Sequence, residues 1–285
     1  MACRELEGKL AFITGGSRGI GRAIALKLAE MGADVIINYY KNKEKADEVV
    51  KEIESKGVKG YAIQGDFGKK EDIDRVFDEI KEKFGYLDIF VSNAVASGRE
   101  VVGGFAPFLR LKEKGTRRIF DITVMGFIWS TQRAVPLMEG REGKIIAISS
   151  TGTRDYMPNY AIHGAAKSAL EALVRYAAVE FGPKGINVNT VSGGPIDTEA
   201  IQLFPNYEEV KEGTIKLTPL GRMGMPEDIA GVVGFLCTPD AKWIQGQTII
   251  VDGGLSLVRG VNFLLPLSQS FLINDQKSLI SHLSY

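Results

Sequence analysis

Short apolar runs alternate with longer amphipathic stretches along most of the chain. Runs with the length of buried strands lie at 9–14, 34–40, 60–66, 87–94, 143–150, 186–194 and 247–254. Apolar residues at helical spacing predict helices between them, one ending at Gly32 and others over 43–57, 70–85, about 117–138, about 158–181 and 225–237. Strands separated by helices of this length form βαβ units with right-handed crossovers. The pattern therefore predicts a parallel sheet of seven strands.

The alternation continues without a linker or an internal repeat to about residue 258. A chain of 285 residues is long enough for one large α/β domain, so we expect a single domain over 1–258. The tail 259–285 does not continue the pattern, and the sequence leaves its order open. Its apolar stretch 261–273 is too short to span a bilayer.

Composition narrows the function classes. Lys plus Arg and Asp plus Glu both number 35, which argues against a general nucleic-acid binder. Cys3 and Cys237 have no metal-site spacing, and free thiols in a reducing cytosol are the simplest interpretation. The N-terminus lacks the long apolar stretch of a signal peptide, so we expect a cytoplasmic protein with neither a bound metal nor a membrane span.

A glycine-rich turn, TGGSRGIG at 14–21, directly follows the first strand and opens the first helix. Glycine allows a tight turn and a close approach to a ligand, and the N–H groups of a helix N-terminus attract an anion. This context favours phosphate binding over the alternative of a purely structural turn.

The turn has the spacing G-x3-G-x-G, which resembles the short-chain dehydrogenase/reductase family. Further motifs agree in order: Asp66, SNA at 92–94, SS at 149–150 and VDGG at 251–254. The resemblance covers roughly residues 5–258 and implies a single-domain doubly wound Rossmann fold that binds NAD or NADP. The implied cofactor site has Gly15, Ser17, Arg18, Gly19, Ile20 and Gly21 in the turn, Asp66 and Phe67 beside the adenine, and Asn93 and Ala94 along the ribose.

The end of the second strand favours NADPH over NADH. An NAD site usually places Asp or Glu there to bind the ribose hydroxyls, whereas this chain reads INYYKNK. Arg18 and Lys41 could pair with a 2′-phosphate. The alternative is that Lys41 and Lys43 simply face solvent.

Candidate catalytic residues lie in NYAIHGAAK, at 159–167. Tyr160 and Lys167 are seven positions apart, and His163 stands four before the lysine. Steps of four and seven both return to one helix face, about 6 Å and about 10 Å along the axis. A reaction that develops negative charge on oxygen needs a donor such as Tyr160, whose pKa a nearby cation would lower.

The larger branch of the resembling family uses Y-x3-K with a serine thirteen positions before the tyrosine. Anchored on Lys167, that template fits Ser150 but finds His163 at the tyrosine position. The spacing Y-x6-K instead resembles the enoyl-acyl-carrier-protein reductases, and SGGPIDT at 192–198 is similar to the NADPH-dependent third bacterial type. The resemblance implies that Ile196 and Thr198 meet the nicotinamide carboxamide.

Several positions depart from that pattern or keep two interpretations. Thr123 stands where the family often has an asparagine of a proton relay. His163 is either an acid/base or a tolerated pocket residue, and Tyr156 is either a packing or a catalytic residue. The stretch 97–115 could shape an acyl pocket. The segment 199–217 either covers an acyl chain with Ile201, Leu203 and Phe204 or forms a plain packing helix.

The residues and the resemblance together predict an NADPH-dependent enoyl-thioester reductase, acting on acyl-carrier-protein or CoA thioesters in fatty acid synthesis. Tyr160 would stabilise the enolate oxygen, Lys167 would hold the ribose and lower the tyrosine pKa, and Ser150 would assist by hydrogen bonding. The rivals are a 3-oxoacyl or other carbonyl reductase and a non-catalytic NADPH sensor. Small residues on the helix that carries Lys167 suggest a homotetramer or homodimer.

Overall fold

The computed structural model describes residues 4–96, 101–202 and 207–258. The tail 259–285, residues 97–100 of the expected pocket segment, and Leu203 and Phe204 lie outside the described residues.

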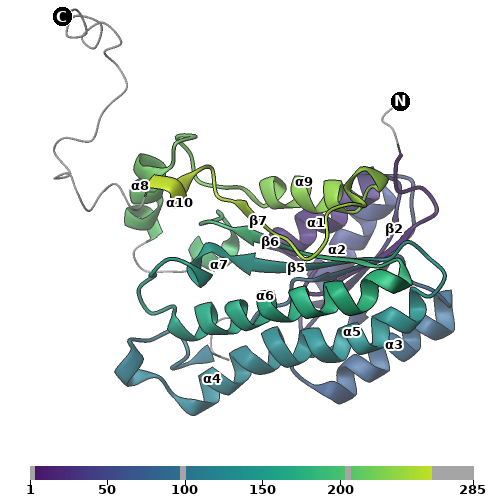
Figure 1. The fold of residues 1–285 in the computed structure, drawn as a ribbon, viewed down its shortest axis with the longest axis horizontal. Helices are drawn as coiled ribbons and strands as arrows, with labels where there is room; N and C mark the ends of the chain where they lie inside the picture. Colours follow the sequence, from purple (N-terminus) through teal and green to yellow (C-terminus); the bar gives the residue numbers. More distant parts are fainter. Residues whose placement is uncertain (1–3, 97–100, 203–206, 259–285) are drawn as a thin grey trace, which may run out of the picture.

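Seven parallel strands form one sheet in the order β3-β2-β1-β4-β5-β6-β7 (Figure 1). They are β1 Leu10–Ile13, β2 Asp34–Tyr39, β3 Gly60–Gln64, β4 Ile89–Ser92, β5 Lys144–Ser150, β6 Asn187–Gly193 and β7 Thr248–Val251. Each lies within a run that the apolar pattern selected. The predicted seven-stranded parallel sheet is therefore confirmed.

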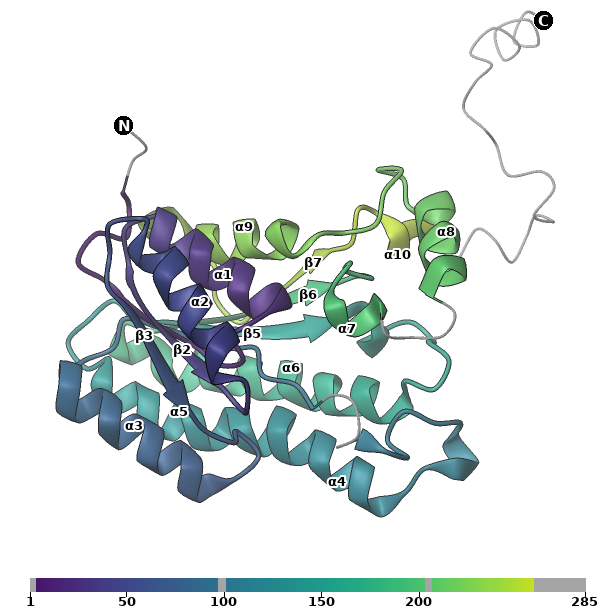
Figure 2. The same cartoon turned by 180° about the vertical axis from the view of Figure 1, so that it is seen from behind.

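Helices cover both faces of the sheet in a three-layer arrangement (Figures 1 and 2). One layer contains α1 Gly19–Glu30, α2 Lys43–Glu54 and α9 Pro226–Leu236, and the other contains α3 Lys70–Phe84, α5 Gly126–Leu137 and α6 Ala161–Phe181. The other α-helices of the described residues are α4 Glu113–Phe120, α7 Glu199–Gln202, α8 Tyr207–Leu217 and α10 Leu255–Val258. Within the described ranges, no helix combines the length and the apolar character needed to cross a membrane.

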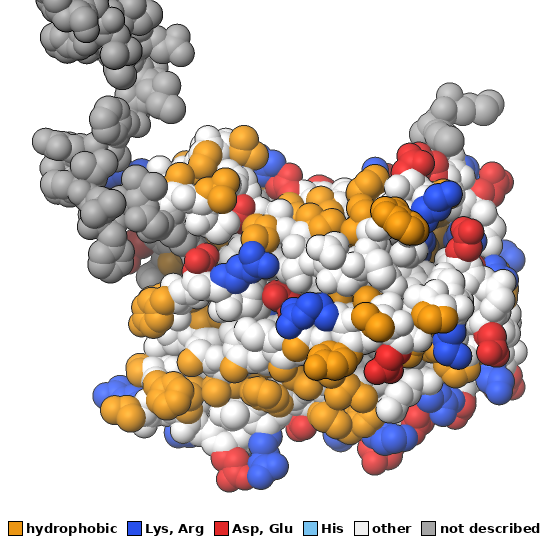
Figure 3. Space-filling model, viewed as in Figure 1, with side chains coloured by type: hydrophobic (Ala, Val, Ile, Leu, Met, Phe, Trp, Pro, Cys, Tyr) orange, Lys and Arg blue, Asp and Glu red, His pale blue; other side chains and the backbone are white. Residues whose placement is uncertain are grey.

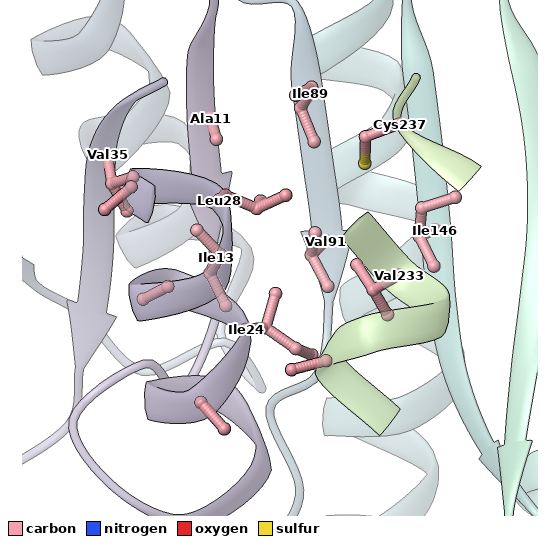
Figure 4. Close-up of a cluster of buried hydrophobic side chains, with 14 of the residues drawn as sticks. Ala11, Ile13, Ile24, Leu28, Val35, Ile89, Val91, Ile146, Val233 and Cys237 are labelled. Atoms are coloured by element: carbon pink, nitrogen blue, oxygen red, sulfur yellow. The ribbon is translucent and has the colours of Figure 1, made fainter. Parts of the chain in front are cut away.

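The two cores follow the alternation of side chains along each strand. Ala11 and Ile13 of β1 face the core under α1 and α9, whereas Phe12 between them faces the core under α3 and α5. Figure 4 shows the first core, where Ile24 and Leu28 of α1 meet the strand side chains. Because both faces are buried, the strands are apolar throughout rather than alternating with polar residues.

Cys237 also lies in the first core (Figure 4), and its thiol is free. Burial raises the pKa of this thiol to about 12. The side chain therefore stays protonated at neutral pH and behaves as a small apolar residue.

Two helices begin at places the periodicity did not predict. The helix expected over 117–138 already starts at Glu113, and it contains a π-helical segment, η3 Asp121–Met125, between α4 and α5. The helix expected from residue 158 starts only at Ala161. Asn159 explains this, because its φ of 63° is the one positive value at a non-glycine residue within the described ranges.

The strand order also indicates where the candidate active site lies. The chain leaves β1 for α1 on one face of the sheet, and it leaves β4 for α4 and α5 on the other. A doubly wound sheet opens a crevice between two such neighbours, outside their carboxyl ends. The glycine-rich turn and the residues after β4 both lie there.

Candidate active site

The glycine-rich turn joins β1 to α1 with little room for side chains. Gly15 has φ 65°, a left-handed conformation that favours glycine. A Cβ on Gly21 would lie 2.2 Å from the carbonyl oxygen of Gly15, so the helix packs directly on the turn. Arg18 precedes α1 and makes no side-chain capping hydrogen bond. The first N–H groups of α1 therefore suit a phosphate.

Asn38, at the end of β2, fixes the turn to its neighbours. Its side-chain oxygen accepts a hydrogen bond from Gly15 N at 3.2 Å, and its nitrogen donates to the carbonyl oxygens of Ile63 at 3.3 Å and Gly65 at 3.0 Å. This buried asparagine was not selected from the sequence. The available signal was a single polar residue inside the apolar run 34–40.

Asn93 and Ala94, predicted along the ribose, lie against the same turn. Asn93 Nδ2 donates to the carbonyl oxygens of Thr14 at 2.9 Å and Gly15 at 3.2 Å. The backbone N–H groups of Asn93 and Ala94 donate to Thr14 Oγ1 at 2.9 and 3.0 Å. The loop after β4 is thus joined to the loop after β1 at the crevice.

Asp66 and Phe67, the two residues predicted beside the adenine, have different surroundings. Asp66 is buried and accepts hydrogen bonds from Arg118 at 2.8 Å and from Gly68 N at 3.0 Å. The ring of Phe67 packs in the core, 5.8 Å from the ring of Phe12. A contact between adenine and the Phe67 side chain stays a prediction.

Cations gather around Tyr40 just after β2. Lys41 Nζ lies 4.5 Å from the centre of the Tyr40 ring, and the Arg118 guanidinium lies 5.8 Å from it. Arg118 comes from α4 and could not be assigned to this site from the sequence. Because it also pairs with Asp66, it offsets the negative charge of that buried carboxylate.

The loop after β6 crosses to the glycine-rich turn. A Cβ on Gly19 would lie 3.6 Å from Thr198 Cγ2, and both residues line one groove with Ser17 and Arg18. Ile196 is buried and forms an isolated parallel bridge with Gly224. The structure therefore brings Thr198 to the predicted phosphate turn, whereas Ile196 lies mainly within the protein.

Asp197, between these two residues, anchors the segment expected to cover the substrate. It accepts hydrogen bonds from the Tyr207 hydroxyl at 2.9 Å and from Gln202 at 2.8 Å. The Gln202 bond and then the Tyr207 bond hold the pKa of the Asp197 carboxyl below its usual value. This ionised side chain ties α7 and α8 to the loop after β6, and sequence reasoning missed it.

Ser150 ends β5, Tyr160 lies just before α6, and Lys167 lies in the second turn of that helix. The side chains of Tyr160 and Ser150 share a hydrogen bond, and Ser150 Oγ also accepts one from Gly152 N at 3.2 Å. Burial raises the pKa of Tyr160, and the Ser150 bond lowers it only in part. The net shift is upward and its causes are burial and the Ser150 bond, so the prediction that Lys167 lowers the pKa of Tyr160 is wrong. Tyr160 is therefore a protonated hydrogen-bond donor at neutral pH.

Lys167 is buried, and its ammonium donates to the carbonyl oxygen of Ile148. Burial lowers the pKa of Lys167 to about 8, and the carboxylate of Glu171 acts in the opposite direction. Glu171, one turn further on α6, accepts hydrogen bonds from Ser149 at 2.6 Å and Thr153 at 3.2 Å. It fixes the end of β5 to α6, and its spacing of four from Lys167 was the signal that could have identified it.

His163 lies between Tyr160 and Lys167 on the same side of α6. Its ring stacks on Tyr160 with centroids 5.2 Å apart and an interplanar angle of 25°, and Phe105 contacts it at 4.8 Å. Burial and then the charge of Lys167 lower the pKa of His163 to about 4. The imidazole is therefore neutral at pH 7, which counts against its use as the general acid.

Thr123 occupies the middle of the π-helical segment η3. Gly126 N donates to the carbonyl oxygen of Asp121, five residues earlier, which marks one inserted residue in the helix. Thr123 is buried there. Single π turns of this kind often occur at functional sites. A relay role for Thr123 stays a prediction.

Two glycines make room for the Tyr160 ring. A Cβ on Gly152 would lie 2.6 Å from Tyr160 Cε1, and a Cβ on Gly164 would lie 2.7 Å from the carbonyl oxygen of Gly152. The turn after β5 and the first turn of α6 can therefore approach closely, which sets the position of the tyrosine hydroxyl.

We predict that Gly152→Ala shifts this ring and lowers kcat roughly 100-fold, because a displacement of about 1 Å has that order of effect. The matched control is Gly231→Ala in α9, where a Cβ meets no atom within 4 Å. Steady-state kinetics and thermal unfolding of both variants check the prediction. Equal activity in the two variants would mean that Gly152 does not position Tyr160.

Comparisons with known protein sequences identify a family and relatives of this chain. The family described as Enoyl-(Acyl carrier protein) reductase matches residues 15–256. The chain is 41% identical over 252 residues to 1-cyclohexenylcarbonyl-CoA reductase of Streptomyces collinus, covering 88% of each chain. It is 39% identical over 264 residues to the hydroxynaphthalene reductase-like protein Arp2 of Metarhizium anisopliae, covering 88% of this chain and 96% of the relative.

Solved structures of similar fold belong to the same class of protein as these relatives. The crystal structure of a short-chain dehydrogenase from Burkholderia cenocepacia in complex with NADP is 33% identical, with a TM-score of 0.80, and the match covers 88% of this chain and 99% of that one. The relatives act on different substrates, so they establish the family and the oxidoreductase class but not one substrate. This chain belongs to the short-chain dehydrogenase/reductase family of oxidoreductases.

Proposed function

We propose that this chain reduces the carbon–carbon double bond of an enoyl thioester with NADPH, on an acyl-carrier-protein or CoA carrier, as in fatty acid synthesis. The observation that carries the proposal is the hydrogen bond between Ser150 and Tyr160. This bond joins Ser150 to Tyr160, the tyrosine seven positions before Lys167. The position four before Lys167 holds His163, whose imidazole is neutral. The matched family and the Streptomyces relative support the same reaction.

The residues have separate tasks in this reaction. NADPH, when bound, supplies the hydride that the β-carbon of the substrate receives. Tyr160 donates a hydrogen bond to the thioester carbonyl oxygen, where negative charge develops, and Ser150 orients the tyrosine hydroxyl. Lys167 would hold the nicotinamide ribose. Thr198 and the backbone of Ile196 would orient the nicotinamide, and Gly15 to Gly21 with Ser17 and Ile20 would hold the phosphates.

The cofactor preference is supported by charge. The end of β2 has no carboxylate, and Lys41 and Arg118 lie beside the Tyr40 ring there. Together with Arg18 at the glycine-rich turn, they suit the 2′-phosphate of NADPH.

We predict that Lys41→Glu weakens NADPH binding roughly tenfold or more and leaves NADH binding nearly unchanged, because only NADPH carries the phosphate. Fluorescence titration with each cofactor measures the ratio. Lys43→Glu is the control, because Lys43 is paired with Asp47 at 2.7 Å on the exposed side of α2. The same loss for both cofactors would argue against a 2′-phosphate contact.

A paired substrate assay tests the reaction itself. Purified protein is given NADPH with crotonyl-CoA and, separately, with acetoacetyl-CoA, and NADPH oxidation is followed. We expect oxidation with the enoyl substrate. Oxidation with the keto substrate alone would favour the rival carbonyl reductase, a class supported by the hydroxynaphthalene reductase-like relative. Tight NADPH binding without any turnover would favour the non-catalytic sensor.

Self-association as a homodimer or homotetramer is also part of the proposal. Tyr176 and Val179 of α6 are 72% and 78% exposed, and Figure 3 shows hydrophobic side chains gathered over the layer of α5 and α6. Apolar side chains on one helical layer suit an interface between copies. Sedimentation or light scattering measures the oligomeric state directly.

A further inference from the structure

His163 carries a buried polar atom that the reaction described above does not use. Its Nδ1 is shielded from solvent and has no hydrogen-bond partner within the part of the chain that the structure describes. Buried polar atoms in folded proteins nearly always have a partner, and each exception calls for an explanation. Here the atom lies in the candidate active site, so a substrate group is the natural partner to consider.

The position of the ring limits which group that could be. His163 stacks on Tyr160 at 5.2 Å and lies one turn before Lys167 on α6. Phe105 covers the ring at 4.8 Å and is itself 37% exposed. A substrate whose carbonyl oxygen meets Tyr160 therefore has its neighbouring carbons beside His163.

The chemistry of the ring shows which kind of hydrogen bond Nδ1 can make. The backbone of Ala96 is a hydrogen-bond partner of the imidazole, and we assign that bond to Nε2 because Nδ1 has no partner in the described part of the chain. A neutral imidazole that donates through Nε2 carries a lone pair on Nδ1. Nδ1 is therefore an acceptor, and its partner must be a donor such as a hydroxyl group.

We propose that His163 is a specificity-determining residue whose Nδ1 accepts a hydrogen bond from a hydroxyl group that the substrate carries next to its reacting double bond. The preferred substrate class is then a hydroxylated enoyl thioester rather than a plain aliphatic one. This inference rests on the proposed enoyl-thioester reduction. It assigns a role to the buried Nδ1 of His163, whose ring stacks on Tyr160.

Matched thioester pairs test the preference. 4-Hydroxycrotonyl-CoA is compared with crotonyl-CoA, and 2-(hydroxymethyl)acryloyl-CoA with methacryloyl-CoA, so that the hydroxyl group is placed on either side of the double bond. We expect one hydroxylated probe to be preferred roughly 5- to 10-fold in kcat/KM, the effect of one neutral hydrogen bond. His163→Phe should abolish the preference and keep turnover of the plain substrate. His163→Gln should restore part of it, because an amide oxygen also accepts.

The outcomes separate this inference from the proposed function. No preference in the wild type, or a preference that persists in His163→Phe, overturns the role of His163 while reduction of crotonyl-CoA still stands. Failure to reduce any enoyl thioester overturns the proposed function and this inference together.

Nitrogen NMR gives a readout that does not depend on turnover. The chain contains two histidines, so the spectrum of His163→Phe assigns the His163 signals. In the presence of NADP⁺, 4-hydroxybutyryl-CoA should shift the Nδ1 signal and butyryl-CoA should not. Equal shifts with both compounds would contradict a hydrogen bond to the hydroxyl group.

Discussion

Tyr160→Phe should lower kcat by about 10²- to 10⁴-fold and leave NADPH affinity nearly unchanged. The phenol ring fills the space against Gly152 and stacks on His163, and phenylalanine keeps both contacts. Only the hydroxyl that bonds Ser150 is lost, and with it the donor to the thioester oxygen. Steady-state rates with crotonyl-CoA and fluorescence titration with NADPH measure the two effects separately.

Tyr156→Phe is the matched control. Tyr156 lies four residues earlier in the same segment and is 89% exposed, so loss of its hydroxyl should change neither kcat nor affinity. Unchanged turnover in Tyr160→Phe would remove this tyrosine from the mechanism. In that case His163, at the position where the larger branch of the family has its tyrosine, would be the next candidate for the donor.

The strands were predictable because their burial is nearly uniform. A parallel strand covered on both faces leaves a continuous apolar run such as 9–14 or 143–150, and the glycine-rich turn after the first run marks where a helix begins. Right-handed crossovers alone do not fix the order of the strands; the doubly wound arrangement, in which β1 and β4 are neighbours, was implied by the family resemblance. The location of the site was therefore accessible from the sequence.

The local geometry of the site was less accessible. The left-handed conformation of Asn159 delays the start of α6, and an apolar pattern does not reveal it. The π-helical turn that contains Thr123 alters the backbone hydrogen bonds of the helix, and the sequence did not indicate it. Both features concern backbone conformation, which the spacing of apolar residues does not report.

Supporting residues were missed for a related reason. Asn38, Arg118 and Glu171 make hydrogen bonds to partners 23, 52 and 22 positions away in the chain, so no short motif contains both members of these hydrogen-bonded pairs. The pKa of Tyr160 also moved against the expected direction, because burial raises it and the Ser150 hydrogen bond offsets that effect only in part. Sequence reasoning names groups that can react, whereas the surrounding protein sets their protonation.

Lys167→Ala should weaken NADPH binding roughly 10- to 100-fold and also remove most turnover, because a charged hydrogen-bond donor to the ribose is lost. Wild-type NADPH affinity should fall as the pH rises through about 8, where the ammonium loses its proton. Fluorescence titration between pH 6 and 9.5 checks this. Lys184→Ala is the control, since this exposed lysine just after α6 should leave the wild-type pH profile unchanged.

The pH dependence of folding stability gives an independent test of Lys167, because the direction of the change in the free energy of unfolding can be predicted. The folded-state pKa of Lys167, about 8, lies below the ordinary lysine value of 10.5. Between these values the unfolded chain binds more protons, so this group makes the protein more stable as the pH rises, by on the order of 3 kcal/mol. Urea unfolding of wild type and Lys167→Ala across that window should show the free energy of unfolding of the wild type rising relative to that of the variant, because other titrating groups such as Cys237 contribute to both proteins. Parallel curves for the two proteins would mean that Lys167 is not held in a buried site in solution, and its proposed role beneath Tyr160 would fail with it.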